Sequence, residues 1–307
     1  MSRMCSQVLE EVHRSILGLL QHIASAEKVS SLLDVGCWDG STTIEYAGVA
    51  HGARAFGIEV FQGPAAQAAQ RGVSVAVMDL ERDRFPWPDQ SMDLVVCNQV
   101  FEHLKNVWLP MSEIARVLRV GGHLLFSVPN LASLHNRALL ALGQQPTSIR
   151  TFGPHVRGFT LGQVKDLLGA DGVFRIRRIT AVGFYPLPAK WARAFATLLP
   201  GAAHTSILWV QKVEHRSEWP WAAYAQVLQA TKWTDDTGSR DSASQPAADP
   251  ASSQTIGASA TALNENWTCT RYAVTAASHP AASIRAEPAA RRHVRTALQT
   301  TNPHTAA

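Results

Sequence analysis

Apolar residues near the start of the chain recur at helical spacing. Val8, Val12, Ile16, Leu19 and Ile23 follow one another at intervals that place their side chains on one face of an α-helix. We therefore predict an amphipathic helix here and assign residues 1–27 to an N-terminal helical segment.

Short apolar runs follow, and stretches of helix length separate them. Apolar runs of about four to eight residues that alternate with helical patterns predict a parallel β-sheet with crossover helices. The clearest helices are predicted at residues 108–119, with Gly121-Gly122 as the C-terminal turn, and at residues 161–168. The runs that predict strands are 31–35, 53–60, 73–78, 94–97, 123–128, 174–184 and 205–213.

The composition changes near Glu214. The remaining sequence is rich in Ala, Ser and Thr, and from about residue 234 it has too few large apolar residues to offset the entropy lost on ordering. We therefore expect one α/β domain at residues 28–214 and a low-complexity, largely disordered tail at residues 215–307.

Charge and cysteine content exclude several classes of protein. The formal net charge of +4 is small for 307 residues, and no dense basic stripe with interleaved aromatic residues suggests a nucleic-acid partner. The four cysteines are scattered without a Cys-x-x-Cys pair, so no metal site and no disulfide framework are expected. No apolar run is long enough for a transmembrane segment, and Glu10, Glu11 and Arg14 interrupt any signal peptide. We expect a cytoplasmic protein, and its oligomeric state stays open.

The first predicted strand ends in a glycine-containing turn, within the sequence "SLLDVGCWDGSTT". Gly36 and Gly40 follow the carboxyl end of the strand, where open parallel sheets bind their ligands. A residue without a Cβ adopts positive φ readily and lets a ligand approach the backbone. A simple strand-to-helix turn without a ligand is the alternative interpretation.

Acidic residues end the next two predicted strands. Glu59 follows "AFGI", and Asp79 follows "VAVM". A carboxylate at the first position accepts hydrogen bonds from ribose hydroxyls, and one at the second accepts from an exocyclic amine such as that of adenine. Each alone is more often a solvated acid, but in series they describe an adenosine pocket. The chain lacks the G-x-G-x-x-G and P-loop patterns that bind phosphates.

Five segments in order resemble the successive motifs of class I S-adenosylmethionine-dependent methyltransferases. They are "LLDVGCWDGS", "GIEV", "VMDLE", "FPWPDQSMDLVVCNQVFEHL" and "EIARVLRVGGHLLFSVPN", and the resemblance covers roughly residues 28–185. The motifs resemble those of the small-molecule group that includes ubiquinone-biosynthesis methyltransferases and MetW-like proteins. This resemblance implies a Rossmann-like fold, with a seven-stranded, mostly parallel sheet between helices and an antiparallel last strand. It also implies S-adenosylmethionine as cofactor.

The resemblance also implies which residues contact the cofactor. The methionine end, the ribose, the adenine and the sulfonium are each assigned to motif positions of this sequence. These assignments are Asp34, Gly36, Cys37 and Gly40 for the methionine end, Glu59 for the ribose, Asp79 and the Leu80 amide for the adenine, and Asn98 for the sulfonium.

Trp38 departs from the family pattern, which commonly has glycine at this position. Its ring either packs against the N-terminal helix or lies over the cofactor, where its π-face would favour the positive sulfonium. We include Trp38 among the cofactor-binding residues and leave both positions of the ring open.

Methyl transfer from a sulfonium is a direct displacement that requires alignment of donor and acceptor and exclusion of water. A hydroxyl acceptor also needs a base. The candidates are His103 in "FEHL" and His155 in "GPHVRGFT", and His155 and Arg157 are candidate acceptor contacts. The alternatives are that His103 bonds a backbone carbonyl and that Thr160 caps the following helix.

Three functions are compatible with these patterns. The first is an S-adenosylmethionine-dependent methyltransferase that acts on a small molecule or a lipid- or sugar-linked intermediate, at oxygen. The second is a non-catalytic, cofactor-binding accessory protein of MetW-like type. The third, an NAD-dependent oxidoreductase, is disfavoured by the glycine spacing and by the acid at Asp79. "CNQV" stands where many enzymes that methylate amino groups carry an N-P-P-Y-type tetrapeptide, so we expect a small-molecule acceptor.

Overall fold

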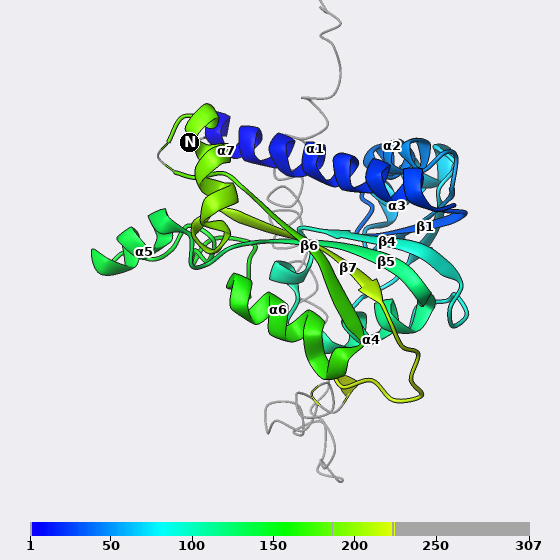
Figure 1. Ribbon diagram of the computed structural model, residues 1–307. Helices are drawn as coiled ribbons and strands as arrows, with labels where there is room; N and C mark the ends of the chain where they lie inside the picture. Colours follow the sequence, from blue (N-terminus) through cyan, green and yellow to red (C-terminus); the bar gives the residue numbers. More distant parts are fainter. Residues whose placement is uncertain (1, 186, 223, 225–307) are drawn as a thin grey trace, which may run out of the picture.

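The computed structural model describes residues 2–185, 187–222 and 224 of the 307-residue chain. A seven-stranded sheet in the order β3-β2-β1-β4-β5-β7-β6 lies between two layers of helices (Figure 1). The strands are β1 Ser31–Val35, β2 Arg54–Glu59, β3 Ser74–Val77, β4 Met92–Asn98, β5 Leu118–Pro129, β6 Phe174–Val182 and β7 Thr205–Lys212. The helices are α1 Ser2–Ala26, α2 Ser41–Val49, α3 Gln62–Gln70, α4 Trp108–Val117, α5 Leu134–Ala141, α6 Leu161–Gly169 and α7 Ala189–Leu198.

Alternation along the central strands builds two cores, one on each face of the sheet. Leu94 and Val96 of β4 belong to the core that contains the apolar face of α1. Val95 and Cys97 belong to the opposite core, with α4 and α6. Figure 1 shows α1 crossing one face of the sheet and α4 and α6 covering the other. Successive side chains of a strand point to opposite faces, so continuous apolar runs are expected of strands buried on both sides.

Strands β1 to β5 pair in parallel, and β7 pairs antiparallel with both β5 and β6. This arrangement confirms the mostly parallel sheet with an antiparallel last strand. The strand order reverses at β1, whose neighbours are β2 and β4. Such a switch point leaves a crevice beyond the carboxyl ends of the strands. The predicted N-terminal helix and all seven strand regions are confirmed.

The predicted end of the helix at residues 108–119 is wrong. Helix α4 ends at Val117, and Leu118 already pairs with Met92 as the first residue of β5. Gly121 and Gly122 therefore lie inside β5, where the β4–β5 register is irregular and Gly121 has a φ of 81°. The apolar pattern runs on from the helix into the strand, so the sequence does not mark the junction.

Packed structure continues past the domain boundary expected at residue 214. Trp221 is 2% exposed, packs against Phe174, and donates a hydrogen bond from Nε1 to the Leu167 carbonyl at 2.9 Å. The expected boundary is therefore too early, because this part of the presumed tail completes a hydrophobic core. Most of the tail predicted at residues 215–307 lies outside the described residues.

The two ends of the segment between β5 and α6 lie next to each other. Asn130 and Phe159 form an isolated parallel bridge, and the Leu131 amide donates to the Phe159 carbonyl at 2.8 Å. Asn130 also donates from Nδ2 to the carbonyls of Gly201 and Ala203. Residues 131–158, including α5, therefore leave and rejoin the sheet at neighbouring points.

Helix α6 begins with the predicted Thr160 cap. The Gln163 amide donates to Thr160 Oγ1, and the Thr160 amide donates to the Gln163 side chain, which is a complete capping box. None of the helices in the described part of the chain has the length and apolar character needed to cross a membrane.

Candidate cofactor and acceptor site

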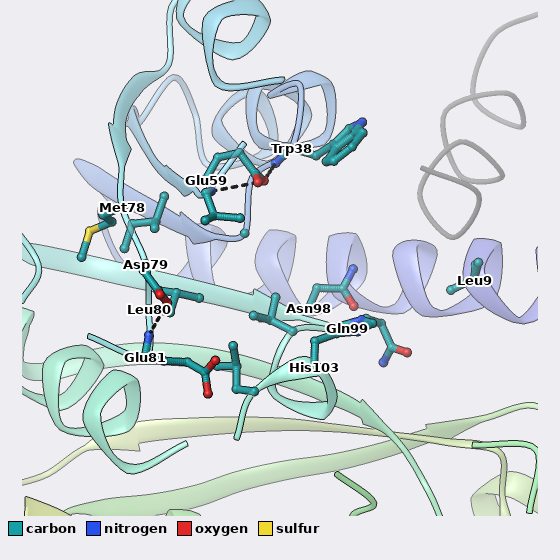
Figure 2. A pocket seen from close by; sticks show the side chains of 15 residues that line it. Leu9, Trp38, Glu59, Met78, Asp79, Leu80, Glu81, Asn98, Gln99 and His103 are labelled. Atoms are coloured by element: carbon teal, nitrogen blue, oxygen red, sulfur yellow. Dashed lines mark hydrogen bonds between the residues drawn. The ribbon is translucent and has the colours of Figure 1, made fainter. Parts of the chain in front are cut away.

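A cavity of about 300 Å³ lies beyond the carboxyl ends of β1, β2 and β4 (Figure 2). Its position is the crevice at the switch point of the sheet. Of the predicted site residues, those that line it are Gly36, Trp38, Glu59, Asp79, Leu80, Asn98 and His103. The lining also includes residues that the sequence analysis did not single out as site residues, among them Leu9 of α1, Met78, Glu81 and Gln99.

The turn after β1 presents its backbone to this cavity. Gly36 has a φ of 77°, and Trp38 adopts a φ of 51° that is unusual for a side chain with a Cβ. The amides of Gly36 and Cys37 both donate to the Ile58 carbonyl at 2.9 Å, which ties the turn to β2. The turn is therefore held in place from the neighbouring strand.

Asp34, Cys37 and Gly40 are not among the residues that line the cavity. Asp34 is buried and accepts a hydrogen bond from Thr43 Oγ1 at 2.6 Å. The Cys37 side chain is buried in a small core with Ala68. A Cβ on Gly40 would lie 2.7 Å from the Ala68 Cβ, so this glycine permits close packing of α2 against α3. These three residues therefore stabilise the turn and its packing against the neighbouring helices without lining the cavity.

Glu59 is nearly buried and organises the backbone around it. Its Oε2 accepts from the Trp38 amide at 2.9 Å, and its Oε1 accepts from the amides of Val60 and Phe61 at 2.9 Å and 3.1 Å. Figure 2 shows the first two of these bonds at the edge of the cavity. A carboxylate offers about four acceptor positions. Acceptor capacity therefore remains for a ligand hydroxyl.

Asp79 lies at the end of the cavity formed by the turn after β3. Its Oδ1 accepts from the Glu81 amide at 2.9 Å, and its own amide donates to Asp83 Oδ2 at 2.8 Å. Its side chain is 41% exposed, and Leu80 beside it is buried. The carboxylate is therefore positioned by a local turn and remains accessible from the cavity.

Asn98 and Gln99 form the wall after β4. Asn98 Oδ1 accepts from Ser127 Oγ at 2.5 Å, which fixes the orientation of this amide. Gln99 has a φ of 55°, and its amide donates to the Ser127 carbonyl at 3.0 Å. The sequence carries no signal for Gln99, because its backbone conformation depends on this contact with β5.

The structure gives Trp38 a partner that the sequence did not suggest. Its ring lies edge to face against Phe61, with the ring centroids 6.0 Å apart, and it lines the cavity. Figure 2 shows the ring on the rim formed by the turn after β1. The Trp38 ring therefore borders the cavity at its rim.

The two candidate catalytic histidines lie together. The ring centroids of His103 and His155 are 4.8 Å apart, and His103 lines the cavity whereas His155 lies behind it. His103 Nδ1 bonds the Pro154 carbonyl at 3.2 Å, and His155 Nδ1 bonds the Ser148 carbonyl at 2.8 Å. Burial lowers the pKa of His155, and the bond to Ser148 opposes that effect only in part.

Arg157, the other candidate acceptor contact, is turned toward the protein. Its Nη2 donates to the Lys105 carbonyl at 2.7 Å, and its guanidinium lies 5.1 Å from the centre of the Trp108 ring. It does not belong to the lining of the cavity. In this structure it braces the loop before α6 against α4.

Comparisons with known proteins agree with this geometry. A family model described as "Methyltransferase domain" matches residues 33–126. The chain is 31% identical over 161 residues to a bifunctional methionine biosynthesis protein MetXA/MetW of Rhodopirellula baltica, covering 46% of this chain and 24% of that protein. It is 31% identical over 160 residues to a probable S-adenosylmethionine-dependent methyltransferase of Mycolicibacterium smegmatis, covering 52% and 57%. The alignments thus span at most 57% of these two relatives.

A solved structure resembles the chain more distantly. An S-adenosylmethionine-dependent methyltransferase from Mesorhizobium loti aligns with a TM-score of 0.43 and 18% identity, covering 61% of this chain and 93% of that one.

The strand order and the cavity beyond β1 and β4 define a Rossmann-like α/β domain with a cavity at the switch point, where such sheets bind their ligands. Residues 33–126 match the family model "Methyltransferase domain", and the ordered motifs are similar to those of class I S-adenosylmethionine-dependent methyltransferases. S-adenosylmethionine is the methyl donor of that class, and the residues that line the cavity suit it: a backbone turn, a carboxylate with acceptor capacity at Glu59 and another at Asp79.

Proposed function

We propose that this protein transfers a methyl group from S-adenosylmethionine to an oxygen atom of a small molecule or of a lipid- or sugar-linked intermediate. The observation that supports this most is the series of polar groups around one cavity, from the backbone turn after β1 through the carboxylates of Glu59 and Asp79. These groups follow one another along three strand ends in the order that an extended ligand with an amino-acid end, a ribose and an adenine would need.

In the proposed complex, Glu59 accepts the ribose hydroxyls and Asp79 accepts the adenine amine beside the Leu80 amide. The Gly36 turn holds the methionine end, with Asp34, Cys37 and Gly40 supporting the turn. Asn98 lies near the sulfonium, because it ends β4 on the side of the cavity that His103 also lines. The Trp38 ring lies beside the bound cofactor at the rim of the cavity.

The transfer itself forms a bond between the acceptor oxygen and the methyl carbon while the bond from sulfur to that carbon breaks. The electron pair stays on sulfur, so the leaving thioether needs no proton. The enzyme aligns the two reactants and excludes water. A hydroxyl acceptor must lose its proton, and His103 is the imidazole that lines the cavity where this would occur. His155 lies directly behind it.

The first experiment is calorimetric titration of the full-length chain with S-adenosylhomocysteine. We expect micromolar binding by the wild type and at least a hundredfold weaker binding by Glu59→Ala. The control variant is Glu10→Ala, which removes an exposed acid that pairs with Arg14 on α1. It should bind as the wild type does. Circular dichroism would check that each variant is folded.

Absence of binding by the folded wild type would contradict the proposal. Binding of a nicotinamide dinucleotide in its place would favour the oxidoreductase alternative.

A non-catalytic, cofactor-binding role is the second candidate. One relative that resembles this chain is named a bifunctional methionine biosynthesis protein MetXA/MetW. Release of S-adenosylhomocysteine in a screen of hydroxyl-bearing acceptors would favour the enzyme. Tight cofactor binding without turnover on any acceptor would favour the accessory role.

A further inference from the structure

Three side chains beside the cavity form a cluster of potential metal ligands, and one of them, His103, lines the cavity. Glu102 and His103 belong to the 3₁₀ turn η1, Phe101–His103, and His155 belongs to the loop before α6. Each offers one ligand atom, and these atoms all lie within 4.8 Å of one another. The cluster, found within the described part of the chain, therefore consists of two imidazoles and one carboxylate.

Hydrogen bonds fix the tautomer of both imidazoles. A backbone carbonyl only accepts, so the Nδ1 atoms that bond the Pro154 and Ser148 carbonyls must carry the protons. In a neutral imidazole the lone pair then lies on Nε2. Donation of the second ring N–H to a carbonyl is the arrangement that accompanies metal-ligating histidines.

The carboxylate lies close to this lone pair. Glu102 Oε1 is 4.0 Å from His103 Nε2, and the side chains of Glu102 and His103 are 2% and 5% exposed. Water contributes little to solvating a carboxylate at such a place. A cation bound between it and the imidazoles would compensate for the burial of its charge.

Backbone contacts hold the two contributing segments together. The Glu102 carbonyl accepts hydrogen bonds from the amides of Val156 at 2.9 Å and Arg157 at 3.1 Å. The turn that carries two of the ligands is therefore bonded directly to the loop that carries the third. Ligand atoms around a tetrahedral zinc ion lie about 3.4 Å apart. Side-chain movements of about 1 Å would bring the three atoms to that separation.

We propose that Glu102, His103 and His155 bind a divalent transition-metal cation such as Zn²⁺ or Mn²⁺. Two imidazoles and one carboxylate are a donor set that such cations accept, with coordination positions left open. The expectation of no metal site rested on the cysteines, and this site uses none of them.

The role of the cation rests on the proposed methyl transfer. An open coordination position next to the cavity would take the acceptor hydroxyl and lower its pKa. The hydroxyl proton would then pass to solvent, and the acceptor oxygen would bond the methyl carbon as the carbon–sulfur bond breaks, with the electron pair of that bond staying on sulfur. The two histidines would act through the cation instead of removing the proton themselves.

The test is binding of the metal alone to the full-length, tag-free chain after treatment with a chelator. We expect one equivalent of Zn²⁺ to bind with micromolar or tighter affinity in calorimetry. Co²⁺ in its place should give the visible absorption bands of a low-symmetry site. His155→Asn and Glu102→Gln should each weaken Zn²⁺ binding at least fiftyfold. The matched control is His22→Asn, which removes an exposed histidine that lies against Trp209 and should leave the binding unchanged.

Titration with S-adenosylhomocysteine separates this proposal from the proposed function. His155→Asn should bind S-adenosylhomocysteine as the wild type does, because His155 does not line the cavity. A folded wild type that binds S-adenosylhomocysteine but no stoichiometric metal would overturn the metal site alone. Unchanged metal affinity in folded His155→Asn would do the same. Metal binding without any binding of S-adenosylhomocysteine would leave the site in place and contradict the methyltransferase proposal.

Discussion

The two sides of the cavity are built by different means. On the side of β1 to β3, the turn after β1 presents backbone, and its glycines and buried side chains hold that backbone in place. On the side of η1 and the loop before α6, side chains do the corresponding work, with His103 and His155 as the main examples. The first side is fixed by the register of the sheet, and the second by contacts between distant segments.

This difference predicts which substitutions affect both stability and cofactor binding and which leave cofactor binding unchanged. A turn that must approach one cofactor closely tolerates few changes, because any added atom meets packed neighbours. A loop that carries polar side chains keeps its fold when one of them is exchanged. We therefore expect substitutions on the first side to act on stability and cofactor binding together. Substitutions on the second side should leave cofactor binding intact.

The largest effect is expected for Gly40→Ala. The residue has a φ of 76°, and the added Cβ would lie 2.7 Å from the Ala68 Cβ and 2.8 Å from its Cα. Backbone strain and overpacking should together lower the free energy of unfolding by about 3 kcal/mol or more. Urea unfolding measures this change.

The control for that prediction is Gly52→Ala. Gly52 has a φ of 80°, but nothing lies within 4 Å of its missing Cβ. The loss here should be about 1 kcal/mol, from the left-handed backbone alone. Equal losses in the two variants would show that the packing of α2 against α3 does not constrain the turn.

On the second side, His204 should make stability depend on pH. Burial, with smaller contributions from the neighbouring His135 and His155, lowers the pKa of His204 from 6.5 to about 4. The unfolded chain therefore binds a proton at a higher pH than the folded chain does. Stability is complete above pH 6.5 and falls as the pH decreases toward 4, by about 3 kcal/mol.

The variant His204→Asn should lack this part of the acid sensitivity. The measurement is the difference in unfolding free energy between wild type and variant at about pH 7 and about pH 4.5. A difference that stays constant between the two pH values would show that His204 is protonated in the fold as easily as in the unfolded chain.

A smaller effect is expected for Asp79→Asn. An amide keeps the size of the side chain, but its NH₂ group donates where an adenine amine also donates. S-adenosylhomocysteine should bind about tenfold more weakly, and the unfolding free energy should change little because the side chain is 41% exposed. Asp83→Asn is the matched control in the same turn. Equal affinity of Asp79→Asn and wild type would remove this residue from the proposed adenine site.

The smallest effect concerns the rim. If the Trp38 ring acts on the sulfonium through its π-face, Trp38→Ala should weaken binding of the cationic S-adenosylmethionine about threefold more than that of the neutral S-adenosylhomocysteine. We expect this result, because the ring lines the cavity and its position is supported by Phe61. An equal loss for both ligands would reduce Trp38 to a packing role.

The sheet could be predicted from the sequence, because its apolar runs end where polar residues and glycines begin. The position of three cavity-lining residues on the first side could be predicted for the same reason, since Gly36, Glu59 and Asp79 lie at or next to strand ends. The junction of α4 and β5 could not be predicted, because Leu118 continues the apolar pattern of the helix into the strand. The core position of Trp221 was missed, because the surrounding composition resembles that of the tail.

The metal-ligand cluster was beyond prediction for a different reason. Pro154 lies 51 residues after His103, and His155 is the next residue, so no local spacing relates the two histidines. Its approach depends on hydrogen bonds from the amides of Val156 and Arg157 to the Glu102 carbonyl, which join two loops. A pattern in one segment carries no information about such a contact.

The bridge between Asn130 and Phe159 determines how easily the length of the segment between them could change during evolution. Residues 131–158 are inserted between two adjacent points of the sheet, so their replacement by a segment of other length changes the entropy of loop closure only slowly. The insertion contains His155 but no residue of β1 to β4. A lineage could therefore change the length of this segment while the strand ends that border the cavity stay as they are.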